Sequence, residues 1–274
     1  MLEKLKYMNH LGEVIEFGSG SFYVNENDLH NFSWKVTSKN DRISSFKKNI
    51  VNKSLPVIIV CSSKEEGIRK RNQLFEICEK DVLAMQHGRL IIGDYYLKCY
   101  VVESKKTDYL TSAGYMKLTL KVSTDFPEWV KETTTAFGYA VGKEKGSDLD
   151  FNRDFPSDYT SNLLGIGLIN TGFVPSNFII RIYGACENPK ITIAGHEYSV
   201  NGSCSANEYM TIDSIAKTIT NTKADGSIEN CFNLRNRDSY IFEKIPVGIS
   251  NVSSNGDFKF DVTLLEERSE PRWT

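Results

Sequence analysis

The sequence of 274 residues lacks the features that mark membrane, secreted and nucleic-acid-binding proteins. No apolar run approaches the roughly 20 residues that a membrane-spanning helix needs, so we expect no membrane contact. The first residues carry no apolar core of the signal-peptide kind, and we expect assembly in a cytoplasm. The net charge is −2, without the concentrated basic face that nucleic-acid binding requires.

Histidine is scarce and the cysteines show no regular spacing. The four histidines form no metalloprotease motif and adjoin no plausible nucleophile, so the sequence predicts no enzyme, cofactor or metal site. The six cysteines lack CxxC spacing and lie in apolar or strand-like stretches. We interpret them as small core residues, with a disulfide set as the less favoured alternative. They are Cys61, Cys78, Cys99, Cys186, Cys204 and Cys231.

Two patterns superficially resemble ligand sites. Residues 18–22 read Gly-Ser-Gly-Ser-Phe, but a strand-like stretch follows in place of the helix whose N-terminus would bind an anion. Four aspartates lie between residues 148 and 158; their spacing matches no EF-hand and Pro156 interrupts it, so calcium binding is the less favoured alternative there. We interpret the first as a turn and the second as a solvated loop.

The first half of the chain predicts strands and one helix. Residues 13–17 and 22–24 read as two strands joined by a tight turn, and residues 32–36 as a further strand. The apolar run 55–61 predicts a buried strand. A helix begins at Ser63, where Ser-x-x-Glu forms a capping box, and its apolar stripe predicts the face that lies on a sheet. That stripe comprises Ile68, Leu74, Phe75, Cys78 and Val82.

Strands resume after the helix. Residues 88–94, 95–102 and 115–122 are strand-like, and the last alternates with period two. The polar connection Glu103–Gly114 predicts an extended hairpin arm between the second and third of these. Residues 132–147 are rich in threonine, glycine and charge, so we place a domain boundary near residue 134.

The second half predicts short strands and no helix. Asn201-Gly202 predicts a hairpin that returns the chain from residues 197–200 towards residues 208–212. Asp225-Gly226 repeats the turn signal. Short strands with regular turns are typical of a sandwich. The sequence thus predicts a mainly β protein, with a helix-containing domain at residues 1–134 and a β-sandwich domain at residues 135–274.

The last nine residues are the most informative part of the sequence. They read Glu-Glu-Arg-Ser-Glu-Pro-Arg-Trp-Thr and follow an alternating, strand-like stretch, residues 257–265. Chain ends usually fray, whereas paired charges, a proline and a large aromatic residue favour docking. The segment resembles the C-terminal signature of the distal tail protein (Dit) family of long-tailed, siphovirus-type bacteriophages.

This resemblance extends along nearly the whole chain as short matches in a fixed order. Each match is weak alone, and their order and spacing together are specific. The matching segments are Gly93–Leu97, Thr124–Trp129, Asn170–Phe173, Phe178 with Ile182–Gly184, Asn188–Pro189, Glu208–Tyr209, Ile212–Asp213, Asn230–Phe232, Phe242–Gly248 and Glu267–Trp273.

The resemblance implies a structural protein of the tail tip, assembled in the host cytoplasm. It implies a first domain with a β-sandwich-like fold that builds a closed ring, a homohexamer, and an outer, galectin-like domain. The implied partners are other copies of the chain, the tail-tube protein and the tail-associated baseplate protein.

If copies of the chain form a ring, particular residues are expected to contact the neighbouring copy. A closed ring needs head-to-tail contacts, and a strand-rich arm can supply them. We expect the arm, with Lys105, Lys106 and Tyr109, to clasp a neighbouring copy. We expect Trp273 to pack in a pocket, with Arg268 and Arg272 paired to carboxylates.

Two further readings remain open. The second domain is compatible with a carbohydrate-binding adhesin that contacts host glycans of the cell wall, because β-sandwiches often bind glycans, although fold alone does not establish function. A tail-tube protein or a wall hydrolase is the third reading.

Overall fold

The computed structural model describes residues 4–24, 26–108, 114–138, 160–161 and 167–272. Over these residues the protein is mainly β with a single α-helix, as the sequence predicts. The chain divides into two compact units. Unit 1 comprises Met1–Val130 and Arg268–Thr274, and unit 2 comprises Lys131–Glu267. The chain passes between them within strands β10 (Trp129–Phe137) and β23 (Phe260–Arg268).

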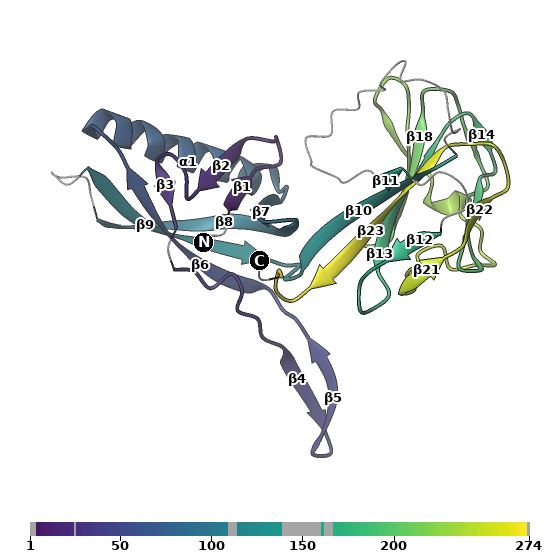
Figure 1. Cartoon of the computed structure of the whole chain (residues 1–274), viewed down its shortest axis with the longest axis horizontal. Helices are drawn as coiled ribbons and strands as arrows, with labels where there is room; N and C mark the ends of the chain where they lie inside the picture. The colour runs from purple at the N-terminus through teal and green to yellow at the C-terminus, as the bar shows by residue number, and fades with distance from the viewer. Residues whose placement is uncertain (1–3, 25, 109–113, 139–159, 162–166, 273–274) are drawn as a thin grey trace. The chain divides into compact units, whose positions relative to one another are not determined.

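Unit 1 contains two antiparallel sheets that share one long strand (Figure 1). The first has the order β2-β1-β7-β8, and the second has the order β3-β6-β9-β8. The strands are β1 (Leu5–Met8), β2 (Val14–Phe17), β3 (Phe22–Tyr23), β6 (Val51–Val60), β7 (Gly88–Ile92), β8 (Tyr95–Asp108) and β9 (Tyr115–Thr124). A separate two-stranded hairpin comprises β4 (Lys35–Lys39) and β5 (Arg42–Lys47).

Strand β8 joins the two sheets because its halves have different partners. Residues 95–99 pair with β7, and residues 100–108 pair with β9. Register shifts between Val101 and Glu103 and between Lys106 and Asp108 mark bulges, which bend and twist a strand. Because β8 and β9 pair up to Asp108 and Lys117, they form the extended hairpin that the sequence predicts. Residues 109–113, between the two strands, lie outside the described part.

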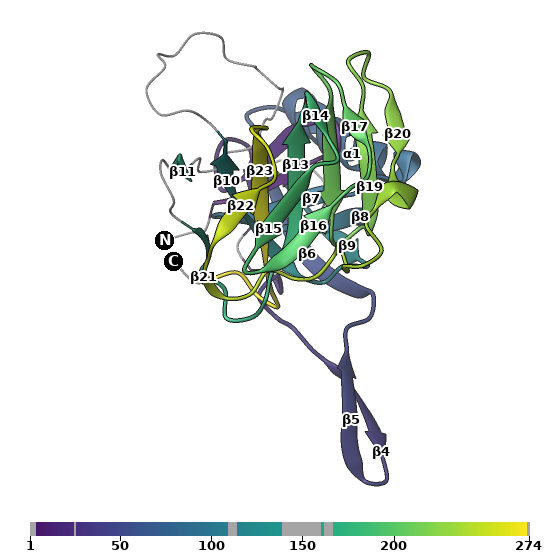
Figure 2. The same ribbon diagram turned by 90° about the vertical axis from the view of Figure 1, so that its right-hand side faces the viewer.

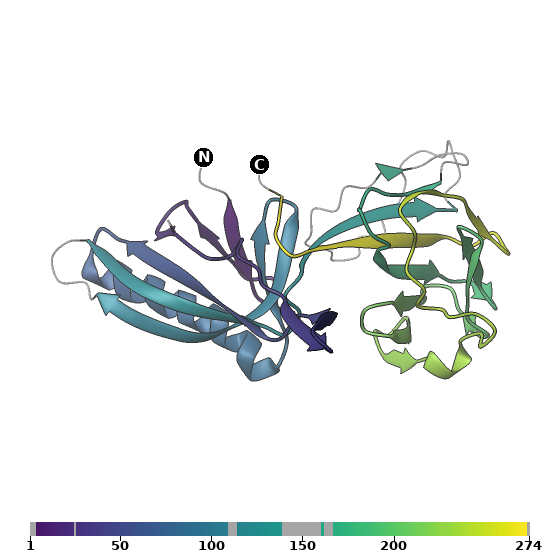
Figure 3. The same ribbon diagram turned by 90° about the horizontal axis from the view of Figure 1, so that it is seen from below.

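Helix α1 (Lys64–Ala84) begins where the sequence predicts (Figure 3). The Ser63 hydroxyl accepts from the amide of Glu66 at 3.1 Å. The Glu66 carboxylate accepts from the amide of Ser62 at 2.8 Å instead of from the cap residue itself, so the capping box is shifted by one residue. The helix ends at Ala84, and Met85 follows it in the left-handed conformation. The Met85 amide donates to the main-chain oxygens of Asp81 and Val82 in the last turn.

The predicted apolar stripe of α1 is only partly correct. Leu74 and Cys78 are buried, but Ile68, Phe75 and Val82 are 46%, 56% and 36% exposed. The buried face instead comprises Gly67, Leu74, Ile77, Cys78 and Asp81. The buried face is rotated from the predicted stripe because Asp81 accepts hydrogen bonds from Tyr7 and His10. These residues lie far from α1 in the sequence, so periodicity cannot predict the contact.

Two further expectations for unit 1 need correction. The run 55–61 alternates between buried and exposed residues instead of being buried throughout, since one face of β6 lies outside the core. The strand expected at residues 32–36 begins at Lys35, and Trp34 is 46% exposed, whereas Trp129 is 1% exposed within the core.

Unit 2 is built from an antiparallel sheet and smaller sheets that share its core (Figure 2). The main sheet has the order β23-β13-β18-β19-β20, and its strands are β13 (Asn177–Tyr183), β18 (Tyr209–Asp213), β19 (Thr218–Thr222) and β20 (Ile228–Asn230). The smaller sheets are β16-β15-β22, β12-β21 and β14-β17, with strands β12 (Leu168–Asn170), β14 (Cys186–Glu187), β15 (Lys190–Ile193), β16 (His196–Ser199), β17 (Ser203–Cys204), β21 (Gly248–Ser250) and β22 (Val252–Ser254). Strand β11 (Thr160–Ser161) pairs with β10, and a 3-10 turn spans Phe232–Leu234.

The core of unit 2 lies between these layers. Phe178 and Ile180 of β13 are fully buried, as are Ile191 and Ile193 of β15. The turn at Asp225-Gly226 joins β19 and β20, as predicted. The hairpin predicted at Asn201-Gly202 is wrong, because β16 pairs with β15 while β18 pairs with β13 and β19.

Candidate assembly surfaces of unit 1

The projecting hairpin, residues 35–47, extends away from the rest of unit 1 (Figures 1 and 2). Val36 and Phe46 are direct cross-strand partners and are 51% and 57% exposed. Trp34 packs edge-on against Phe46, with ring centroids 6.4 Å apart. Large apolar side chains gathered on an exposed projection mark an interaction surface. An isolated two-stranded hairpin is also marginally stable in water, which favours a partner.

The local sequence explains this hairpin, although the sequence reading overlooked β5. Asn40 and Asp41 have positive φ values of 51° and 57°, as the two central residues of a type I′ turn require. The Asn-Asp pair was the available signal, and it is weaker than Asn-Gly. Residues 35–48 carry five basic side chains against one acidic side chain, so the hairpin and its base are distinctly basic.

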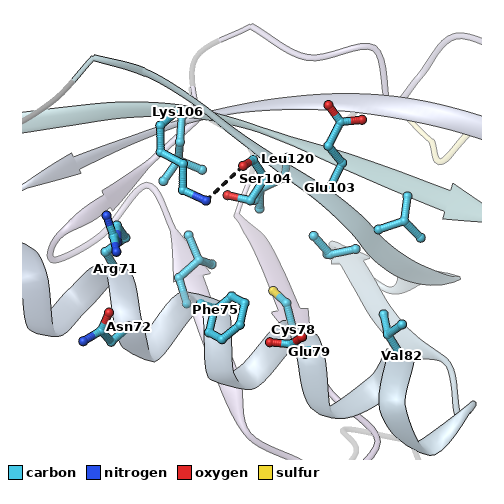
Figure 4. A pocket seen from close by; sticks show the side chains of 14 residues that line it. Arg71, Asn72, Phe75, Cys78, Glu79, Val82, Glu103, Ser104, Lys106 and Leu120 are labelled. Atoms are coloured by element: carbon cyan, nitrogen blue, oxygen red, sulfur yellow. Dashed lines mark hydrogen bonds between the residues drawn. The ribbon is translucent and has the colours of Figure 1, made fainter.

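A groove runs between α1 and strands β8 and β9 of the same unit (Figure 4). It has a volume of about 470 Å³. Phe75 of α1 projects into it, and Val82 and Val102 are further half-exposed apolar residues on its walls. We call this feature the helix groove. The residues lining it are Arg71, Asn72, Leu74, Phe75, Cys78, Glu79, Val82, Val101, Val102, Glu103, Ser104, Lys106, Leu118 and Leu120.

The charged residues of the helix groove are segregated. Glu79 and Glu103 lie at one end, and Arg71 and Lys106 lie at the other (Figure 4). The Lys106 ammonium donates to the main-chain oxygen of Ser104 at 2.9 Å, which holds the side chain against the strand. The groove thus has two basic residues on one side and two acidic residues on the other, with apolar side chains between and beyond them (Figure 4).

The C-terminal segment, residues 268–272, belongs to unit 1. The Lys48 ammonium donates to the Ser269 hydroxyl at 2.8 Å and to the Glu128 carboxylate at 2.7 Å. It also lies over the Trp34 ring, 4.5 Å from the centroid. The Lys48 side chain is only 8% exposed. One buried cation thus connects the base of the projecting hairpin to the C-terminal segment.

The predicted docking residues have separate locations. Lys106 lines the helix groove, and Lys105 is an exposed neighbour on β8. Arg268 donates from Nε to the main-chain oxygen of Glu270 at 3.3 Å, and Arg272 is exposed. Neither arginine lines the helix groove. Tyr109 and Trp273 lie outside the described residues, as does the acidic stretch 148–158.

The other acidic, histidine and cysteine side chains of the described residues form no metal site. Within the described ranges, no group of three or more histidine, cysteine, aspartate or glutamate side chains could hold a metal ion. No helix in those ranges is long and apolar enough to cross a membrane. The cavity of unit 2 next to Phe173 and Glu267 has a volume of about 10 Å³, against roughly 300 Å³ or more for typical small-molecule sites.

Sequence comparisons identify no relative. No family model matches the sequence, and no curated protein matches it.

The fold, by contrast, is shared with solved phage structures. The chain is similar to a chain of the phage P2 baseplate in its activated conformation with calcium, at 12% identity and a TM-score of 0.65, over 99% of this chain and 100% of that one. The same baseplate with strontium gives the same values. The SPP1 Dit protein, described as a paradigm of the hub of the adsorption apparatus in phages that infect Gram-positive bacteria, gives 11% and 0.59 over 98% and 100%. The resemblance seen in the sequence is confirmed at the level of the fold.

Proposed function

We propose that this chain, which has the fold of a phage tail hub protein, is a non-enzymatic structural protein of a phage or phage-like tail. The observation that carries the proposal is the fold match over 98–99% of the chain, which includes both units. The site in question is a surface for other copies of the chain, because unit 1 presents two different exposed apolar features.

The two features fit the requirements of a ring. A closed ring needs two different patches on each copy, one of which meets the other on the next copy. The projecting hairpin supplies an insert, with Val36 and Phe46 as apolar anchors. The helix groove supplies the recess, with Phe75 as its apolar wall and Glu79 and Glu103 to meet the basic side chains of the hairpin. We propose that copies join head to tail in this way into a homohexamer.

The ring would join the tail tube to the baseplate. Its partners on the two sides would be the tail-tube protein and the tail-associated baseplate protein, with unit 2 as the outer, galectin-like domain. The alternative, a carbohydrate-binding adhesin module that contacts the host cell wall, remains a second proposal for unit 2, and loss of glycan binding on removal of residues 135–274 would support it.

The test of ring formation is the mass of the purified chain in solution together with negative-stain images. We expect hexameric rings for the unmodified chain. Val36→Ser combined with Phe46→Ser should give folded single copies, because the anchors are lost while the core of unit 1 is untouched. Val14→Ser is the matched control, since Val14 is a similarly exposed strand residue (42%) outside both features, and it should retain the rings.

The role of the projecting hairpin and the role in a phage tail can be contradicted separately. Rings that survive the double substitution would rule out the projecting hairpin as the insert. Single copies of the unmodified chain at every concentration, together with its absence from any tail particle, would rule out the proposed function.

A further inference from the structure

Two cysteines of unit 2 face each other across a pair of short strands. Cys186 of β14 and Cys204 of β17 are direct partners in the antiparallel register. Such partners have Cα atoms about 4.5–5.5 Å apart, and disulfides span Cα separations of about 4.4–6.8 Å. Both cysteines are free thiols in this structure. The backbone therefore already places the two residues at bonding separation.

The two thiols differ in their access to solvent. Cys186 is partly exposed, whereas Cys204 is 1% exposed. The Cys204 thiol donates to the amide oxygen of Asn221 at 3.7 Å. The partly exposed Cys186 thiol therefore lies opposite the buried Cys204 thiol.

The surroundings favour the thiolate at the exposed position. Hydrogen bonding of the Cys186 thiolate to the Cys204 side chain and to the Cys204 amide lowers the pKa of Cys186 below its ordinary value. The same hydrogen bond and burial raise the pKa of Cys204. A thiolate that is exposed and stands beside a second cysteine is the usual arrangement of a redox-sensitive pair.

We propose that Cys186 and Cys204 form a redox site that a small-molecule disulfide, such as oxidised glutathione, converts into a cross-strand disulfide. The Cys186 thiolate attacks one sulfur of the external disulfide, a mixed disulfide forms, and one external thiolate leaves. The Cys204 thiol loses its proton to solvent, and its sulfur attacks Cys186 and expels the second external thiolate. Two protein thiols are oxidised, and one external disulfide is reduced to two thiols.

The other four cysteines lack this arrangement. Cys61, Cys78, Cys99 and Cys231 are all buried. Burial raises the pKa of the Cys78 thiol to about 12 and also raises that of Cys231. Buried thiols of raised pKa react slowly. Cys78 and Cys231 therefore serve as internal controls within the same molecule.

The disulfide would close a loop that contains β15 and β16 and would fix β14 to β17. If the chain is a tail component, the change would follow release from a reducing cytoplasm into oxidising surroundings. That timing depends on the proposed function, but the chemistry does not, because it requires only the folded chain.

The experiment treats the folded, reduced full-length chain with oxidised glutathione at neutral pH and maps the products by peptide mass spectrometry. We expect a Cys186–Cys204 linkage that dithiothreitol reverses. Cys204→Ser should stop at one glutathione on Cys186, and Cys186→Ser should leave Cys204 unmodified. Cys231→Ser is the matched control, because Cys231 is a buried cysteine of the same unit, and it should behave like the unmodified chain.

A second measurement protects the test against a variant that does not fold. In the unmodified chain, iodoacetamide should label Cys186 about ten-fold faster than any other cysteine. The proposal is overturned if the treated chain contains no Cys186–Cys204 linkage, or if Cys186 is labelled no faster than Cys231. Either result can be obtained with single copies or rings, so it leaves the ring proposal untouched.

Discussion

At the scale of single residues, Asp81 has the most demanding environment in unit 1. Its carboxylate is fully buried on α1 and accepts from the Tyr7 hydroxyl at 2.5 Å and from the amide of His10 at 2.8 Å. Burial, and then the bond to Asp81, raises the pKa of Tyr7 far above its usual range, so the phenol stays a donor. A Cβ at Gly88 would overlap both the Tyr7 hydroxyl and the Asp81 carboxylate, which explains the glycine.

We therefore predict that Asp81→Ala destabilises unit 1 by about 3 kcal/mol, because the buried Tyr7 hydroxyl and the part-buried His10 amide lose their acceptor and the His10 ring loses its contact with the carboxylate. The measurement is urea unfolding followed by tryptophan fluorescence, since residues 131–267 contain no tryptophan. Asp125→Ala is the matched control, because Asp125 also bonds to a histidine, His87, but is 58% exposed. A similar loss of stability in both variants would contradict the role assigned to Asp81.

At the scale of elements, the two hairpins of unit 1 differ in how they are supported. Strands β8 and β9 pair with each other, and β9 also pairs with β6, so this hairpin is anchored in the core through Leu118 and Leu120. Among the described residues, the projecting hairpin pairs only with itself in sheet structure, and Trp34 packs against its Phe46. The β8–β9 hairpin is suited to form a wall of the helix groove, whereas the projecting hairpin is suited to be ordered by a partner.

The arm at residues 103–114 yields a prediction at the scale of elements. We expect Lys105→Glu combined with Lys106→Glu to stabilise the rings against dilution, because the glutamate at position 106 would add a negative charge to the wall of the helix groove that receives the basic hairpin. Deletion of residues 105–113 should abolish rings. Solution mass measures both effects, and Lys98→Glu, on the β7-paired half of β8, should have little effect. Intact rings after the deletion would refute a docking role for the arm.

At the scale of the whole molecule, the chain leaves unit 1 in β10 and returns to it at Arg268. Unit 1 is thus made from two separate parts of the sequence, and Lys48 connects them through Ser269. Unit 2 is therefore an insertion in the sequence of unit 1, and unit 1 is complete only when residues from both sides of the insertion come together. Stability of unit 1 therefore depends on residues that follow unit 2 in the sequence.

This dependence predicts the effect of truncation after Glu267. The transition assigned to unit 1 should move to lower temperature by several degrees, since the Lys48 ammonium loses an acceptor while remaining largely buried. The transition of unit 2 should be unchanged. Calorimetry measures both transitions, and tryptophan fluorescence identifies the one from unit 1. Ser269→Ala should reproduce part of the shift, whereas an unaltered unit 1 transition in the truncated chain would show that the segment contributes nothing.

The sequence by itself determined features that depend on neighbours along the chain. The start of α1 at Ser63, the alternation of β9 and the turn at Asp225-Gly226 were all predictable, because caps, strand periodicity and turn chemistry are local. The ordered matches along the chain also pointed to proteins whose fold this chain shares. The mainly β class with one helix followed from the same signals.

Only the tertiary structure decided which faces and strands meet. The rotation of α1 towards Asp81, the exposure of Phe75 and the projecting hairpin depend on contacts between distant residues. Asn201-Gly202 has hairpin chemistry, yet β17 pairs with β14, which sets Cys204 opposite Cys186. Strand pairing is fixed by the core that both partners bury, and a local turn preference is weaker than that burial. The candidate assembly surfaces and the cysteine pair therefore could not be located from the sequence.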